Sequence, residues 1–177
     1  MTTLVLTVIG HDRAGLVDAL AGPIAEHGGS WDHSHLARLA GQFAGIVVVT
    51  VPESTVDALT SSFETFKAQG LLDVRVAIAS TDDDALSDDA ALVELQLVGQ
   101  DRPGIVREIA GALAARGVSI EELETARSSA PMSAEQLFEV NALLRVPTEL
   151  PFEQLQDTLE DIANELMVDL DLRLTEE

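Results

Sequence analysis

The sequence contains no cysteine and no tyrosine, and it has only one tryptophan and five phenylalanines among its 177 residues. Without cysteine the chain has no disulfides, no thiol catalysis and no thiolate metal site, and a cytoplasmic location is the expectation. The scarcity of aromatic side chains removes the stacking platforms on which proteins hold single-stranded nucleic acid. No apolar run reaches the roughly 20 residues of a membrane-spanning helix, and no signal peptide is recognisable at the N-terminus. We therefore expect a soluble protein.

Positive charge is also scarce, because 10 lysines and arginines stand against 31 aspartates and glutamates, for a formal net charge of −21. Phosphate backbones are bound mainly by lysine and arginine, so we expect no direct contact with nucleic acid. We expect no binding to an anionic membrane surface for the same reason. The acidity by itself identifies no partner, because it also suits an ordinary or salt-adapted soluble protein.

The sequence does contain an internal repeat. The segment GHDRAG at residues 10–15 recurs as GQDRPG at residues 99–104, and with an offset of 89, ten of the 21 residues in 10–30 are identical to their counterparts. Identity at a fixed offset predicts a duplicated domain. We therefore expect one domain at 1–80 and a second at 91–177. An acidic linker at 81–90 joins them, since its five aspartates repel one another.

Each half shows the same order of hydrophobic periods. Short apolar strands at 2–10 and 91–99 precede amphipathic helices, which end near Gly28 and Gly117. Pro23 lies inside the first of these helices and predicts a kink or early fraying there. A strand hairpin, a second helix and a last strand complete each half. The sequence thus predicts an α+β protein with two ferredoxin-like βαββαβ domains in tandem, each with both helices on one face of an antiparallel sheet.

The repeated segment stands where the first strand of each half ends and its first helix begins. Glycine there lets the backbone approach a ligand, and the free N–H groups of a helix start can hold a small anion. Asp12 and Asp101 beside these amides can accept hydrogen bonds from an ammonium, so the loop suits the head group of an α-amino acid. The alternative is that both aspartates only cap their helices, a role worth about 1 kcal/mol each.

The sequence Gly-x-Asp-Arg-Pro-Gly-Ile-Val, followed by a helix and Arg-Gly-Val-Ser-Ile, resembles the ACT domain, a regulatory βαββαβ module that binds amino acids. Two copies with no other domain resemble the glycine cleavage system transcriptional repressor family. The resemblance covers about 3–79 and 91–175. It implies two modules side by side in an extended antiparallel sheet, with ligands held between the first loop of one module and the second strand of the other.

The resemblance also implies which residues bind the ligand. In the first half they are Gly10, His11, Asp12, Arg13, Ala14, Gly15 and Leu16, and in the second half Gly99, Gln100, Asp101, Arg102, Pro103, Gly104 and Ile105. The facing strand positions are Asp32, His33, Glu121 and Glu122.

Other chemistry has weaker support. His33 and His35 share one face of a predicted strand, but no third ligand stands at motif spacing, so we expect no metal site and no cofactor. No serine lies in a nucleophile motif, and the repeated loop lacks the lysine of a P-loop, so we expect no enzyme. Two functions remain. The chain is either a sensor that binds a small amino acid and acts on a partner protein such as a transcription factor, or a ligand-independent protein-interaction or oligomerisation module. A homodimer is compatible with both.

Overall fold

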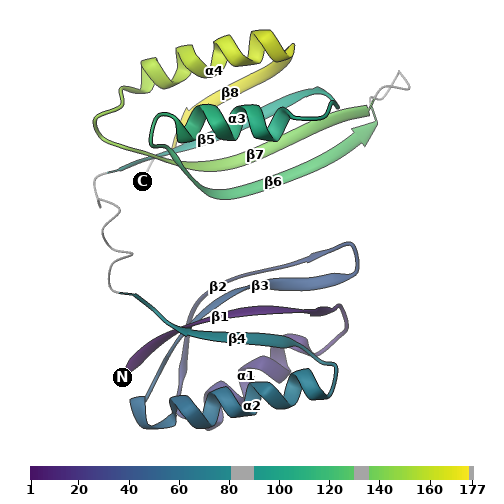
Figure 1. The fold of residues 1–177 in the computed structure, drawn as a ribbon, viewed down its shortest axis with the longest axis vertical. Helices are drawn as coiled ribbons and strands as arrows, with labels where there is room; N and C mark the ends of the chain where they lie inside the picture. The colour runs from purple at the N-terminus through teal and green to yellow at the C-terminus, as the bar shows by residue number, and fades with distance from the viewer. Residues whose placement is uncertain (81–89, 130–135, 176–177) are drawn as a thin grey trace. The chain divides into compact units, whose positions relative to one another are not determined.

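The computed structural model describes residues 1–80, 90–129 and 136–175. The chain divides into two compact units, Met1–Asp82 and Asp83–Glu177, each with its own sheet and its own hydrophobic core (Figure 1). All but the last residue of the predicted linker at 81–90 lies outside the described residues.

The first unit consists of β1 (Thr2–His11), α1 (Leu16–Glu26), β2 (Ser30–Leu39), β3 (Gln42–Val51), η1 (Glu53–Thr55), α2 (Val56–Ala68) and β4 (Asp73–Ile78). Its strands are antiparallel in the order β2-β3-β1-β4. Both helices cover one face of the sheet (Figure 1).

The second unit repeats this plan with β5 (Ala91–Gln100), α3 (Ile105–Ala114), β6 (Ser119–Ser129), β7 (Gln136–Val146), α4 (Phe152–Leu166) and β8 (Val168–Leu174). The strand order is β6-β7-β5-β8, again antiparallel. The predicted tandem of ferredoxin-like βαββαβ domains is confirmed. The side-by-side arrangement of the two sheets stays a prediction.

Each core follows directly from the periods of the sequence. Alternate residues of β1 and β5 point toward the helices, and the core therefore takes Leu4, Leu6 and Val8 in the first unit and Val93, Leu95 and Leu97 in the second. The four-residue spacing of α1 and α3 buries Leu16, Leu20 and Ile24, and correspondingly Ile105, Ile109 and Leu113. Burial of one such side chain is worth about 1.5–3 kcal/mol, so these stripes hold the helices on the sheets.

Helices α1 and α3 end as the glycines predict. Gly28 and Gly117 have φ values of 71° and 69°, and the N–H of the following residue bonds back to the carbonyl of Ile24 (2.8 Å) or Leu113 (3.1 Å). This is the Schellman pattern of helix ends. Pro23 does not end α1, which continues to Glu26, and the predicted early fraying is wrong because the lost bond leaves the last turn intact.

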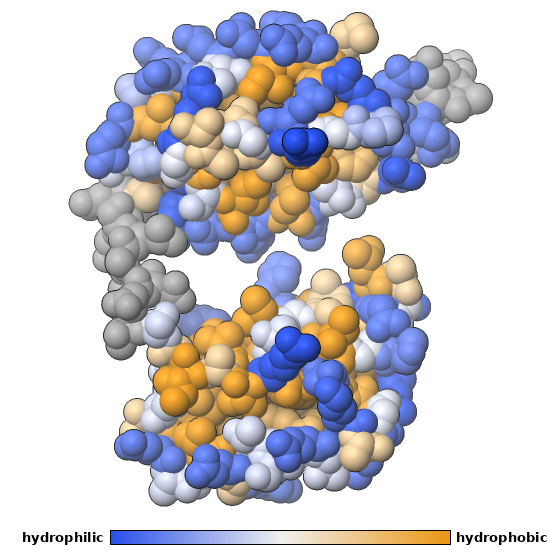
Figure 2. All heavy atoms as spheres, in the orientation of Figure 1, coloured by the Kyte–Doolittle hydropathy of each residue, from blue (hydrophilic) through white to orange (hydrophobic). Residues whose placement is uncertain are grey.

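The sheet faces that point away from the helices differ between the units. Val5, Ile9 and Ile46 lie on this face in the first unit, whereas the corresponding face of the second unit carries Glu94 and Glu124. Elsewhere, hydrophilic side chains cover the outer side of α4, and apolar side chains reach the surface in both units (Figure 2). No helix in the described ranges has the length and apolar character needed to cross a bilayer.

Candidate functional site

The repeated loops connect β1 to α1 and β5 to α3. Gly15 and Gly104 are the N-cap residues, with φ values of 89° and 100°, a left-handed conformation that favours glycine. The backbone N–H of Asp12 donates to the Gly41 carbonyl and that of Asp101 to the Gln136 carbonyl, both at 2.9 Å. Each loop is therefore anchored to the sheet beside the start of β3 or β7.

The two aspartates do not cap the helices. Neither α1 nor α3 has a side-chain cap hydrogen bond, and the alternative role considered from the sequence is wrong for both units. The aspartates do not cap because they precede the N-cap glycines by three residues. Their carboxylates contact arginines of the neighbouring edge strands instead.

Each aspartate forms an ion pair with an arginine at an equivalent position of the repeat. Arg38 Nε lies 2.6 Å from Asp12 Oδ2, and Arg127 Nε lies 3.0 Å from Asp101 Oδ2. The two arginines, which the sequence analysis missed, stand on β2 and β6 and are related by the same offset of 89. That identity is the signal by which they could have been found.

The first glycine of each motif is required by packing. A Cβ on Gly10 would lie 2.6 Å from the Leu71 carbonyl oxygen, and a Cβ on Gly99 would overlap the Val168 side chain. The chain itself therefore makes the close approach that the sequence suggested for a ligand, just before the last strand in the first unit and at its first residue in the second. Close packing explains the first glycine of each motif, and the left-handed N-cap conformation explains the second. The aspartate and the arginines are therefore the groups able to meet a ligand.

The other loop residues differ in their burial and in their contacts. Leu16 and Ile105 are buried in the cores. His11 Nδ1 contacts Gln42 Nε2 at 3.0 Å, and Arg13 Nη2 donates to the Gly70 carbonyl at 3.3 Å. Ala14, Gln100 and Pro103 are exposed.

In the second unit the loop residue Arg102 contacts the first turn of α3. Its Nη2 is 3.6 Å from Glu108 Oε2, and its Nε is buried without a hydrogen-bond partner among the described residues. An unpartnered buried donor is costly, so this nitrogen is a group that a bound ligand can satisfy.

A depression of about 510 Å³ opens beside this loop. Its lining is formed by Asp101, Arg102, Pro103, Gly104, Ile105, Val106, Arg107, Ala110, Arg127 and Phe138. The volume falls in the range of small-molecule pockets, roughly 300–1,000 Å³. The lining brings one carboxylate and three guanidinium groups together with the apolar side chains of Val106 and Phe138. An anion or a zwitterion with a short aliphatic part suits this surface.

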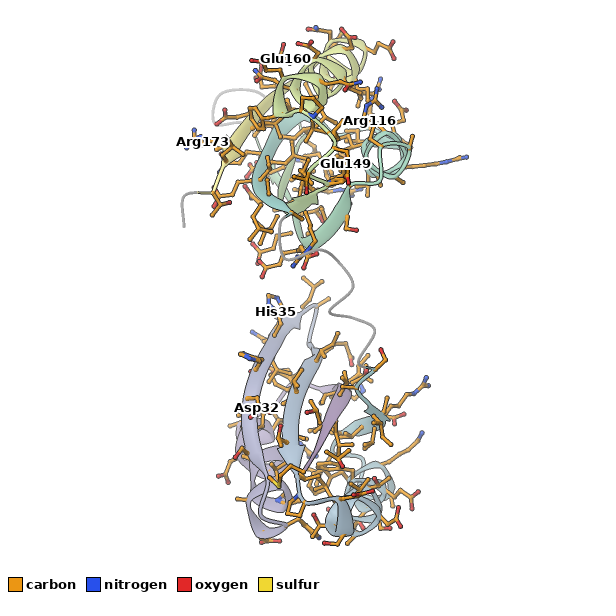
Figure 3. The ribbon with its side chains drawn as sticks, turned by 90° about the vertical axis from the view of Figure 1, so that its left-hand side faces the viewer. Asp32, His35, Arg116, Glu149, Glu160 and Arg173 are labelled. Carbon is orange, nitrogen blue, oxygen red and sulfur yellow. The ribbon has the colours of Figure 1, made fainter. Side chains whose placement is uncertain are left out.

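Asp32 and Glu121, which the sequence placed in the strands facing a ligand, lie at β-bulges of the edge strands β2 and β6. Each is the extra residue of a β-bulge, where the register of β2 with β3, or of β6 with β7, shifts by one. Thr50 Oγ1 donates to Asp32 Oδ2 at 2.6 Å, and Arg145 Nε donates to Glu121 Oε1 at 2.8 Å. These carboxylates thus fix the bulges. Figure 3 shows Asp32 on β2, with His35 farther along the same strand.

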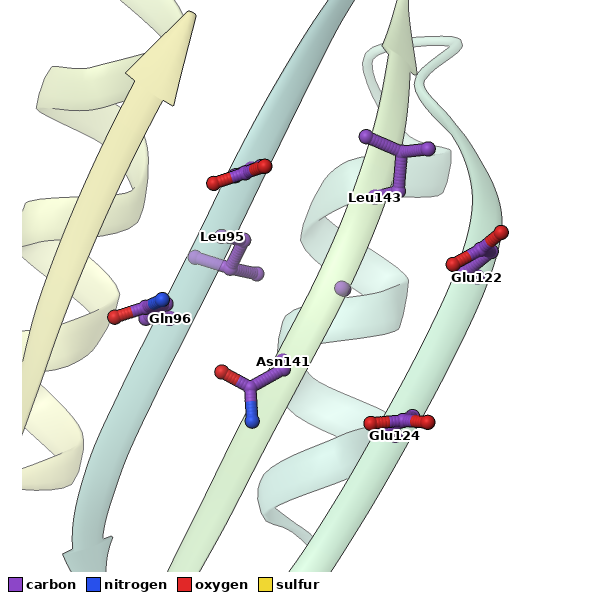
Figure 4. A pocket seen from close by; sticks show the side chains of 8 residues that line it. Leu95, Gln96, Glu122, Glu124, Asn141 and Leu143 are labelled. Carbon is purple, nitrogen blue, oxygen red and sulfur yellow. The ribbon is translucent and has the colours of Figure 1, made fainter. Parts of the chain in front are cut away.

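His33 and Glu122 lie on the sheet faces opposite the helices. Glu122 lines a hollow of about 300 Å³ together with Glu94, Gln96, Glu124 and the β7 residues Asn141 and Leu143 (Figure 4). Within the second unit this hollow and the Asp101 loop do not come together. No group of three metal-ligating side chains occurs in the part of the chain that the structure describes.

Comparison with known proteins identifies the modules. Residues 2–77 and residues 93–164 each match the ACT domain family. The crystal structure of an unknown protein from Galdieria sulphuraria is similar over 99% of both chains, with a TM-score of 0.86 and 28% identity. That of a candidate glycine cleavage system transcriptional repressor covers 99% of this chain and 98% of its own, with a TM-score of 0.75 and 19% identity. No curated protein matches the sequence.

Proposed function

Since the chain belongs to the ACT domain family, two copies of which it carries in tandem, we propose that it is a cytoplasmic regulatory protein that senses a free amino acid. One observation carries the proposal: Asp101 and Arg127 lie 3.0 Å apart at the edge of one depression. A carboxylate and a guanidinium so placed match the ammonium and carboxylate of an α-amino acid. Regulation rather than catalysis follows from a site that offers recognition groups and no nucleophile.

The Asp101–Arg127 pair is accessible enough to be opened by a ligand. The Arg127 side chain is 70% exposed and that of Asp101 is 22% exposed, and an exposed pair of this kind contributes only about 0–1 kcal/mol. The contact between Arg127 Nε and Asp101 uses one of the five N–H donors of the guanidinium. A ligand carboxylate can therefore bind the remaining donors at little cost to the fold.

We propose that the ligand acts by population shift. An amino acid held more tightly in one arrangement of the two domains than in another changes their populations, and a partner protein responds to the change. The candidate glycine cleavage system transcriptional repressor, whose fold this chain shares, supports a transcription factor as that partner.

A thermal-shift screen of the full chain against the twenty amino acids tests the proposal. A ligand at 100 times its Kd adds about 2.7 kcal/mol to the stability of the domain that binds it, so its Tm rises. We expect one or two amino acids to raise the Tm, and Asp101→Ala to abolish the rise. Asp12→Ala is the matched control, because it removes the equivalent carboxylate of the first domain. A flat screen on well-folded protein contradicts the sensor.

A ligand-independent interaction module is the second candidate, favoured by an apolar flank between α3 and β6. Val106, Ile120 and Leu123 are exposed there by 40%, 37% and 46%. Contiguous exposed apolar side chains mark binding surfaces. Light scattering separates the two functions: self-association or partner binding that Leu123→Asp weakens, and that no amino acid affects, supports the interaction module.

We also propose that the chain does not bind nucleic acid directly, because of its net charge of −21. A duplex DNA Kd below micromolar at physiological salt contradicts this.

A further inference from the structure

The two repeats carry side chains of opposite charge at one position of the first helix. Arg107, near the start of α3, lines the depression of the second unit. Its counterpart at the offset of 89 is Asp18, in the first turn of α1. One guanidinium in the second domain thus stands where the first domain has a carboxylate.

Of the three arginines that line the depression, Arg107 is the one without an acidic partner among the described residues. Arg127 pairs with Asp101, and Arg102 contacts Glu108 at 3.6 Å. Arg107 is exposed and forms no ion pair with any described residue. Three of the ten basic residues of a chain with a net charge of −21 therefore line a single depression. Such a local excess of positive charge attracts an anionic ligand.

A neutral amino acid leaves this excess in place. Its ammonium meets Asp101 and its carboxylate meets Arg127, and the two new contacts do not change the net charge of the depression. A second carboxylate on the ligand can accept two parallel hydrogen bonds from the Arg107 guanidinium. The apolar wall of Val106 and Phe138 suits the methylene groups that separate the two carboxylates.

We propose that the second domain selects an amino acid with an acidic side chain, and that Arg107 is the residue that determines this specificity. The inference rests on the proposed amino-acid sensing and names the ligand class of that same site. The first domain does not share the preference, since Asp18 repels a second carboxylate.

Isothermal titration of the full chain at physiological salt tests this with L-glutamate and L-glutamine, and with L-aspartate and L-asparagine. Each pair differs in charge and hardly in shape. We expect the acid to bind about 2- to 5-fold more tightly than its amide, the effect of one partly exposed ion pair. Arg107→Gln makes acid and amide equal. Arg127→Gln weakens both and keeps their ratio, because it removes the contact with the α-carboxylate that both ligands have.

Asp18→Asn is the matched control in the first domain and leaves the ratio of acid to amide at the second domain unchanged. Equal binding of acid and amide by the native chain, or a preference that survives Arg107→Gln, overturns the inference and leaves amino-acid sensing intact. If no amino acid binds, the proposed function fails as well. Succinate and inorganic phosphate are further probes. If either binds as tightly as glutamate, the depression is a plain anion site without recognition of the ammonium, and the inference is wrong.

Discussion

Replacement of Gly10 by alanine tests how tightly the repeated loop is packed against the last strand. The added Cβ would lie 2.6 Å from the Leu71 carbonyl oxygen and 2.9 Å from Leu72 Cδ2. Because the first of these atoms belongs to the backbone, the segment leading into β4 must move. Overpacking of this kind costs typically 1–3 kcal/mol, and we expect Gly10→Ala to destabilise the first unit by about that amount.

Trp31 provides the assay, because it is the single tryptophan of the chain and packs against the core of the first unit. Its fluorescence in urea therefore follows the unfolding of that unit. With an m-value of about 1–3 kcal/mol per molar urea, the midpoint should fall by on the order of 1 M.

Two variants with the same chemical change serve as controls. Gly22→Ala lies inside α1, where a Cβ meets no atom within 4 Å, and we expect it to stabilise the unit by about 0.5–1 kcal/mol. Gly99→Ala makes the equivalent clash in the second unit and should leave the Trp31 transition unchanged. If Gly10→Ala unfolds at the native midpoint while Gly22→Ala shifts it upward, the close approach at Leu71 carries no energetic weight and the packing explanation of the motif is refuted.

Two further perturbations concern the first unit. The hydrogen bond from Lys67, 2.8 Å away, holds the pKa of the Asp73 carboxyl below its ordinary 3.8, so the stabilising effect is present above about pH 4 and is lost as the pH falls through the lowered value. Lys67→Gln should raise the pKa of Asp73 in an NMR titration. It should also reduce the fall of the urea unfolding midpoint as the pH is lowered. An unchanged titration curve would show that the contact does not form in solution. Leu59→Ala empties a fully buried position and should cost about 2–5 kcal/mol, seen as a lower Trp31 midpoint than that of Gly10→Ala. A loss of less than 1 kcal/mol in the free energy of unfolding would mean that neighbouring side chains move to fill the cavity.

The fold could be predicted because the hydrophobic periodicity of each element depends only on nearby residues and recurs in both halves of the chain. Alternation at Val93, Leu95 and Leu97 and the helical stripe of Ile105 and its partners each specify one buried face, and the structure confirms both. The repeat supplied an independent check, since each half had to yield the same order of elements.

The candidate site was harder to predict, because its contacts cross between elements. Arg127 reaches Asp101 only through the register of β6 with β7 and of β7 with β5, which no short stretch of sequence specifies. The bulge at Glu121 depends on a one-residue shift of that register, so the hydrogen bond between its carboxylate and Arg145 could not be predicted from the sequence. The packing of Gly10 was equally hard to predict, because the partner of its close approach lies some sixty residues along the chain.

The bulges at Asp32 and Glu121 also bear on how the protein behaves at high concentration. β2 and β6 each end a sheet, and an exposed edge of unpaired N–H and C=O groups invites a strand from another molecule. The extra residue breaks the regular spacing of these groups, so a foreign strand can pair in register only with 33–39 or 122–129. At the other edge, β4 and β8 are only six and seven residues long, and β8 carries Asp169 and Asp171. Open-ended growth into fibrils is therefore opposed at every edge of both sheets, whether or not the loops hold a ligand.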